Sequence, residues 1–221
     1  MGVLYIVRHG QAPAHAYSTD PDSVGGPGLT DLGFAQARAA GVALARQVKT
    51  FDAVFCGDLP RQRATAASIA EAFDSLPDAT VDADWNEYVT PTVPEGDDIY
   101  AGGGQPFQDA LTHALGAWVN GAAVGPETFE DFVGRTRTAA ARAAEAAGSG
   151  KNVLVVSSAG TITQLVAQLW NVPSESWPAM SRTFVNTAIS KVLSGKRGLT
   201  LVSFNDHAHV ADTTSGLLTY R

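Results

Sequence analysis

Short, nearly continuous apolar segments alternate along this chain with longer segments of helical pattern, and this alternation limits the possible folds. Three of the apolar segments are typical of strands that are buried on both faces of a parallel sheet, namely Val3–Val7, Ala53–Cys56 and Val153–Ser157. We therefore predict an α/β fold, a three-layer α/β/α sandwich with a mostly parallel central sheet. The expected strands are Val3–Val7, Ala53–Cys56, Thr80–Ala83, Val153–Ser157, Ala188–Leu193 and Thr200–Phe204, and the expected helices run from Thr30 to about Lys49, from about Pro60 to Phe73, from Glu127 to Ala147 and from about Gly160 to Trp170.

The length of 221 residues fits a single domain that covers residues 1–221. Hydrophobic residues make up 45% of the chain, but 36 of them are alanines, which favours closely packed helices over a membrane protein. Two segments rich in glycine and proline, Pro21–Gly28 and Thr90–Gln105, are expected to be surface loops rather than linkers between domains.

Charge and cysteine content exclude several classes of protein. The net charge of -7 argues against binding to nucleic acids or anionic membranes, because both need a broad positive surface. The single cysteine, Cys56, cannot form an intramolecular disulfide and favours a reducing compartment. Residues Met1–Val7 lack the features of a signal peptide, and no segment reaches the roughly 20 apolar residues of a membrane-spanning helix. We therefore expect a soluble, cytoplasmic protein.

Polar motifs follow the expected strands, at the sheet edge where α/β proteins bind their ligands. The first strand ends in Arg8-His9-Gly10-Gln11. An imidazole next to a guanidinium, followed by a glycine that lets the backbone turn, suits nucleophilic attack on a bound phosphoryl group. Three more motifs follow, LTDLGFAQA over residues 29–37, DLPRQRATA over residues 58–66 and VVSSAG over residues 155–160.

Taken together, these motifs resemble the histidine phosphatase superfamily, whose founding branch contains the cofactor-dependent phosphoglycerate mutases. The matching motifs occur in the family's order and cover essentially the whole chain, and Asn186 and the segment from Asn205 to His209 also look like this family. The resemblance implies a phosphoglycerate mutase-like fold. It favours a phosphatase over a mutase, because the region between the second and fourth motifs is shorter than expected for glycolytic mutases.

The resemblance also implies roles for individual residues. His9 would be the nucleophile that becomes phosphohistidine, and Arg8 and Arg61 would bind the phosphoryl oxygens, a task that suits the planar guanidinium. Glu87 matches the acid that protonates the leaving alcohol oxygen, a contribution of roughly 10²–10⁴ in rate. Gln11 either reaches the phosphate or fills the loop.

The sequence departs from the family after the strand that ends at Ser157. Ser158 stands where the family has a second catalytic histidine, and Ala159 stands where it usually has a glycine. We expect phosphate still to bind here, because the N–H groups at a helix N-terminus favour an anion. By analogy with the loss of one oxyanion donor, the missing imidazole is expected to cost about 10²–10³ in rate. His207 is the better candidate for a compensating histidine, although a non-catalytic role is favoured for both it and His209.

Most of these residues also have a purely structural interpretation. Arg61 can be a solvated residue on a helix face and Glu87 an ordinary loop carboxylate. For the other residues, we expect a helix cap at Thr30, a packing or capping role for Thr65, exposed positions for Arg63, Arg135, Arg137, Arg142, His15 and His113, and core or interface positions for Trp85, Trp118, Trp170 and Trp177.

The leading hypothesis is a phosphomonoester hydrolase or phosphotransferase that acts through His9, with Arg8, Arg61, Glu87 and Ser158. Its ligand would be a small phosphorylated substrate or inorganic phosphate, with no metal, no cofactor, no nucleic acid and no membrane. The alternative is a catalytically impaired protein that binds or senses phosphate esters, and a third possibility is a scaffold with a vestigial site. A homodimer through a sheet edge or an Ala-rich helix also fits the sequence.

Overall fold

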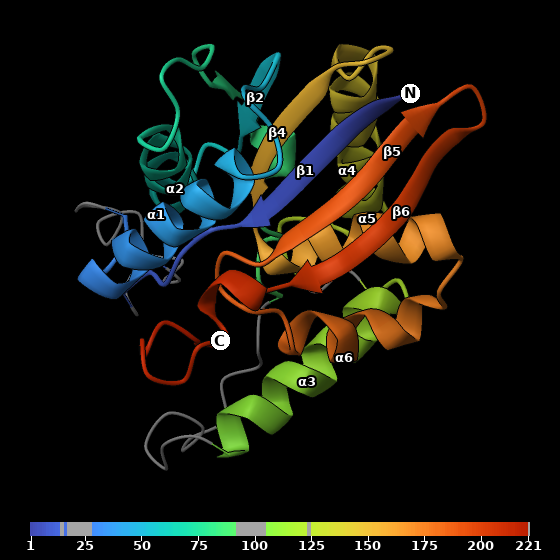
Figure 1. The fold of residues 1–221 in the computed structure, drawn as a ribbon. Coiled ribbons are helices and arrows are strands. Elements are labelled where there is room, and N and C mark those ends of the chain that lie inside the picture. Colours follow the sequence, from blue (N-terminus) through green and yellow to red (C-terminus); the bar gives the residue numbers. More distant parts are fainter. Residues whose placement is uncertain (14–15, 17–27, 92–104, 123–124, 221) are drawn as a thin grey trace.

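The computed structural model describes residues 1–13, 16, 28–91, 105–122 and 125–220, with side chains in α3 from Ala110 onward. The predicted loop segments and His15 therefore lie largely outside the described residues. A six-stranded sheet with the order β3-β2-β4-β1-β5-β6 forms the centre (Figure 1). The first four of these strands are mutually parallel, and β5 and β6 form an antiparallel hairpin beside β1. Their bounds are β1 Gly2–Arg8, β2 Ala53–Cys56, β3 Thr80–Val81, β4 Asn152–Ser157, β5 Ile189–Gly195 and β6 Gly198–Asp206.

Helices cover both faces of the sheet, which confirms the predicted three-layer sandwich (Figure 1). Strand β1 illustrates the reason, because side chains alternate between the two faces of a strand. Tyr5 and Val7 pack with α1 (Asp31–Ala45) and α2 (Pro60–Ala70), whereas Leu4 and Ile6 pack with α4 (Phe129–Ala146) and α5 (Ala159–Trp170). Among the described residues, no helix has both the length and the apolar character needed to cross a membrane.

Local signals set most helix boundaries. The Thr30 hydroxyl accepts the Gly33 N–H at 3.0 Å, so the predicted cap is confirmed, although the helix ends four residues before Lys49, at Ala45. Helix α5 ends at Trp170, because the next residue, Asn171, has a left-handed φ of 51° and terminates the helix before Pro173. The predicted strand Thr80–Ala83 is shorter than expected, because the Asp82 side chain accepts the Asp84 N–H and starts a short 3-10 helix over Ala83–Trp85.

Two helices were not predicted from the sequence, α3 (Gln105–Val119) and α6 (Trp177–Arg182). They lie together beyond α5 in Figure 1 and build a third, mainly aromatic cluster that includes Trp118, Phe132 and Trp177. Tyr88 packs against this cluster, with its ring centroid 5.1 Å from that of Trp177. The cluster therefore supports the segment that carries Glu87. Trp170 is the exception among the tryptophans, since it is 58% exposed.

Candidate active site

The pairing of β1 with β4 brings two of the sequence motifs to one edge of the sheet. Arg8 is in register with Ser157, and the N–H of His9 donates to the Ser157 carbonyl at 2.9 Å. The next residues on these neighbouring strands, His9 and Ser158, therefore leave the sheet side by side. All four of these residues are buried.

Hydrogen bonds define the state of the His9 ring. Nδ1 lies 2.8 Å from the Gly10 carbonyl oxygen, which can only accept, so Nδ1 carries the proton. Nε2 then holds the lone pair, and the Nε–H of Arg61 donates to it at 3.3 Å. The side chain of Asn186 donates to the His9 carbonyl at 3.2 Å and holds the backbone from the other side. The imidazole is thus oriented as a nucleophile at Nε2.

Two guanidinium groups are buried at this edge of the sheet. Arg8 is 2% exposed and donates from Nη1 to the Phe184 carbonyl. Arg61, at the second position of α2, is 6% exposed and donates from Nη1 to the Ala16 carbonyl at 2.7 Å. Arg61 contacts the His9 imidazole, and Arg8 precedes His9 at the end of β1. Two buried cations at this edge of the sheet create a positive site that suits a small anion.

The Glu87 carboxylate lies at the N-terminus of α5. Its Oε2 accepts the Gly160 N–H at 3.1 Å, and its Oε1 accepts the Tyr88 N–H at 3.2 Å. A Cβ on Gly160 would lie 2.4 Å from Oε1, so the glycine permits this close approach. The predicted acid therefore lies against the helix turn that Ser158 and Ala159 begin.

Arg135, which the sequence predicted to be exposed, is instead built into the structure behind Glu87. Its guanidinium binds both carboxylate oxygens of Glu127, at 2.5 and 3.1 Å. It also donates to the carbonyls of Asp84, Asn86 and Glu87 at 2.8–3.1 Å. The prediction was wrong because the acceptors are backbone carbonyls from a distant segment, which residue types do not reveal. The other two arginines of α4, Arg137 and Arg142, are exposed as predicted, and Arg142 pairs with Asp82 and Asp84.

Ser158 and Ala159 form the buried start of α5. The Ser158 hydroxyl makes no capping bond to its own helix and instead accepts a hydrogen bond of 2.9 Å from the side-chain amide of Gln62. Gln62 was not among the residues predicted for the site, although an amide in the first turn of a helix that follows a strand of the site is a usable signal.

Residues around the first motif fix its loop. The side-chain oxygen of Gln11 accepts from the Thr30 hydroxyl at 2.9 Å, and its backbone N–H donates to the Gln36 side chain at 2.9 Å. Thr65 is buried, accepts the Gly10 N–H at 3.0 Å and donates to the Arg61 carbonyl. These bonds connect the loop after β1 to both α1 and α2.

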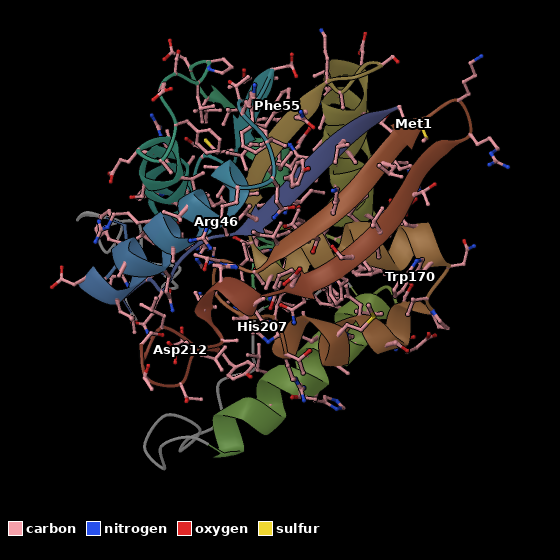
Figure 2. The ribbon with its side chains drawn as sticks, viewed as in Figure 1. Met1, Arg46, Phe55, Trp170, His207 and Asp212 are labelled. Carbon is pink, nitrogen blue, oxygen red and sulfur yellow. The ribbon has the colours of Figure 1, made fainter. Side chains whose placement is uncertain are left out.

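Of the remaining described histidines, His207 and His209 make separate contacts of their own. His207 follows β6 at the end of the sheet opposite Met1 (Figure 2), and its Nδ1 is 2.6 Å from the Asn205 carbonyl oxygen. His209 contacts the Thr187 hydroxyl at 3.3 Å, and burial lowers the pKa of its imidazole. His113 is exposed. Within the described ranges, no three histidine, cysteine or carboxylate side chains are grouped as a metal site.

The chain is similar to known proteins in sequence and in fold. Residues 4–207 match the histidine phosphatase superfamily, branch 1. The adenosylcobalamin/alpha-ribazole phosphatase of Salmonella typhimurium is 28% identical over 182 residues, covering 78% of this chain and 82% of the relative. The alpha-ribazole phosphatase structure from Shigella flexneri has a TM-score of 0.66 at 26% identity, covering 92% of this chain and 96% of that one.

A phosphoserine phosphatase structure from Entamoeba histolytica is less similar in sequence, at 17% identity, and shares the fold, with a TM-score of 0.67 over 95% of this chain and 100% of that one. The family match spans the sheet, both helical layers and every motif that lies at the site. The chain therefore belongs to branch 1 of the histidine phosphatase superfamily.

Proposed function

We propose that this histidine phosphatase is a phosphomonoester hydrolase or phosphotransferase that works through a phosphohistidine at Nε2 of His9. The observation that carries the proposal is the hydrogen bond from Nδ1 to the Gly10 carbonyl, which leaves the Nε2 lone pair beside the buried Arg61. A neutral imidazole with a fixed tautomer is an effective nucleophile.

In the first step, the Nε2 lone pair attacks phosphorus while the bond between phosphorus and the ester oxygen breaks. A phosphoryl group on Nε2 would replace the contact between His9 and Arg61, whose guanidinium would then bind the phosphoryl oxygens together with Arg8. Donors that are already in place stabilise the developing charge without reorganisation. Glu87 gives its proton to the leaving alkoxide, which departs as the alcohol.

In the second step, a water molecule attacks the phosphohistidine. Glu87, now ionised, accepts a proton from this water, the bond between phosphorus and Nε2 breaks, and inorganic phosphate leaves. His9 returns to its neutral form. Because Glu87 donates in one step and accepts in the other, its removal should slow both the formation and the breakdown of the intermediate.

The proposed substrates are small phosphorylated molecules, with hydrolysis favoured over mutase activity. The relative from Salmonella typhimurium is named for adenosylcobalamin and alpha-ribazole, so an alpha-ribazole phosphate ester belongs in the first substrate panel. Residues 1–221 would act as one domain, without a metal or cofactor, and a homodimer is compatible with this function.

The test is turnover of p-nitrophenyl phosphate by the wild type and by His9→Ala, with His113→Ala as a matched control at an exposed histidine. We expect His9→Ala to lose all measurable turnover, because the nucleophile is gone, and His113→Ala to keep it. Equal turnover rates in the wild type and His9→Ala would show that His9 is not the nucleophile.

A second candidate function follows from Ser158, which replaces the expected imidazole donor in the proposed site. On this alternative, the protein binds or senses phosphate esters with little turnover. It predicts phosphate-ester affinity without measurable hydrolysis in the wild type, whereas the leading proposal predicts hydrolysis that depends on His9. The variant Ser158→His also distinguishes the two candidate functions. An enzyme whose site lacks only the imidazole donor should gain activity in this variant while its phosphate affinity stays similar, whereas a binding protein should show no turnover in either form.

A further inference from the structure

Gln62 is a fully buried polar residue in the first turn of α2, and the proposed chemistry does not use it. Its side-chain oxygen accepts the Leu59 N–H at 3.2 Å, which is a helix-capping contact. Its side-chain nitrogen donates to the Trp85 carbonyl at 3.0 Å and to the Ser158 hydroxyl oxygen at 2.9 Å. Helix capping explains the hydrogen bond of the Gln62 side-chain oxygen, but it does not explain the two hydrogen bonds of the side-chain nitrogen.

The count of protons at this amide determines what the Ser158 hydroxyl can do. The Trp85 carbonyl can only accept, so the amide nitrogen of Gln62 must face it and use one of its two hydrogens there. The second hydrogen points to Ser158 Oγ, which therefore acts as an acceptor. Its own hydrogen is left for another partner.

Ser158 has no exposed surface, and within the described part of the chain no group accepts its hydroxyl hydrogen. A buried hydroxyl hydrogen needs an acceptor, since leaving it without one is costly. Ser158 follows the strand residue that is paired with Arg8 and begins the helix that Glu87 contacts. A phosphoryl oxygen bound between these groups is an acceptor of the required kind.

Gly57 provides the space for this arrangement. A Cβ at Gly57 would lie 2.0 Å from the side-chain oxygen of Gln62, so any larger residue would displace the amide. Gly57 follows β2, while Gln62 lies on α2 and Ser158 joins β4 to α5. Two connections at the same edge of the sheet, between β2 and α2 and between β4 and α5, therefore cooperate to orient one hydroxyl group.

We infer that Gln62 is a positioning residue that directs the hydroxyl hydrogen of Ser158 to the transferring phosphoryl group, so that the Gln62–Ser158 pair supplies the donor on the α5 side of the site. The inference rests on the proposed phosphoryl transfer at His9. Ser158 gives a hydrogen bond only, and no proton or covalent bond is exchanged with it. A hydrogen bond to a charged group is worth about 10- to 100-fold in a rate or binding constant.

The experiment is a double-mutant cycle of Gln62→Met and Ser158→Ala, with kcat, KM and vanadate inhibition measured for p-nitrophenyl phosphate. Methionine keeps the length of the side chain and removes the donor. We expect each single variant to lower kcat about 10- to 100-fold, with a smaller change in KM, and to weaken vanadate inhibition similarly. In the Ser158→Ala background, Gln62→Met should have little further effect, because no hydroxyl remains to be oriented.

Gln62→Glu gives a second variant that nearly keeps the shape of the side chain. Its carboxylate would accept the Ser158 hydroxyl hydrogen and turn it away from the phosphoryl group, so activity should fall at least as far as in Gln62→Met. Gln47→Met, at an exposed glutamine, is the matched control and should leave kcat unchanged. Thermal unfolding of each protein shows that it is folded at the assay temperature.

Equal losses of kcat from Gln62→Met in the wild-type and Ser158→Ala backgrounds would overturn the inference, because they would show that Gln62 acts independently of the Ser158 hydroxyl. Wild-type activity from Gln62→Glu would overturn it as well. If the wild type has no turnover that depends on His9, the proposed function fails separately. The same cycle is then measured as affinity for vanadate by calorimetry, where non-additive losses support the inference and additive or absent losses reject it.

Discussion

Removal of the Arg135 guanidinium tests how the structure holds the proposed acid. Arg135→Met breaks two bonds to the Glu127 carboxylate and leaves three carbonyls, those of Asp84, Asn86 and Glu87, without this donor. Methionine retains an aliphatic side chain, so the loss of stability measures the contribution of the charged guanidinium. Glu127 would remain mostly buried without a cation.

The expected magnitude follows from burial. Breaking a buried ion pair by removal of one partner costs about 3–5 kcal/mol. The side chains of Arg135 and Glu127 are 17% and 13% exposed, so water reaches the pair to a small extent. We therefore expect a loss near the lower limit, about 3 kcal/mol. At roughly 2–4 °C per kcal/mol for a chain of this size, Tm should fall by roughly 6–12 °C.

Thermal unfolding followed by circular dichroism measures this shift, and Arg137→Met is the control, because Arg137 lies on the same helix and is exposed. The control should change stability by no more than about 0.5 kcal/mol. In the same proteins, kcat should fall for Arg135→Met alone, since the segment that carries Glu87 loses its anchor. If the two variants have the same Tm, the guanidinium does not stabilise the Glu87 segment and the reasoning is refuted.

Two further predictions concern pH and backbone space. Burial lowers the pKa of the His209 imidazole in the folded protein, so the unfolded chain binds a proton at this imidazole more tightly than the folded chain does. The neutral His209 side chain therefore contributes to stability above a pH of about 6.5, and this contribution is lost as the pH falls below that value. The denaturant midpoints of unfolding at about pH 5 and pH 8 should therefore differ less in His209→Gln than in the wild type. The control variant, His113→Gln, should keep the wild-type difference between the two midpoints. The same difference in His209→Gln as in the wild type would contradict the prediction. Gly33→Ala should destabilise the protein, because the new Cβ would lie 2.1 Å from the Gln11 carbonyl oxygen, whereas Gly134→Ala meets nothing within 4 Å and should stabilise α4 by about 0.5–1 kcal/mol. Equal unfolding free energies of these two glycine variants would reject the steric account.

Much of the fold could be predicted from the sequence, because its signals are local. Short apolar segments indicate the buried strands, and β2 has the predicted bounds Ala53–Cys56. The cap at Thr30 is equally local, since the hydroxyl and the N–H that it accepts are three residues apart. The edge of the sheet that carries the motifs follows from the parallel order of the strands.

The parts that could not be predicted depend on contacts between distant segments. Helix α3 follows a long Gly- and Pro-rich segment, and α6 has six residues, too few for a clear helical period. Arg135 finds acceptors 48–51 residues earlier in the chain, and Gln62 meets Ser158 across 96 residues. A single sequence contains no record of such pairs, so the exposed position predicted for Arg135 was wrong and Gln62 was not singled out.

The proposed mechanism requires a phosphoryl group to bind covalently to Nε2 of His9, between Arg8 and Arg61. A crystal structure of the protein with vanadate, which mimics the transferring phosphoryl group, tests this claim most directly. We predict vanadium bonded to Nε2 of His9, with its oxygens within hydrogen-bonding distance of both guanidinium groups and of the Ser158 hydroxyl. Vanadate bound at a different position, or an empty site at saturating vanadate, would contradict the claim.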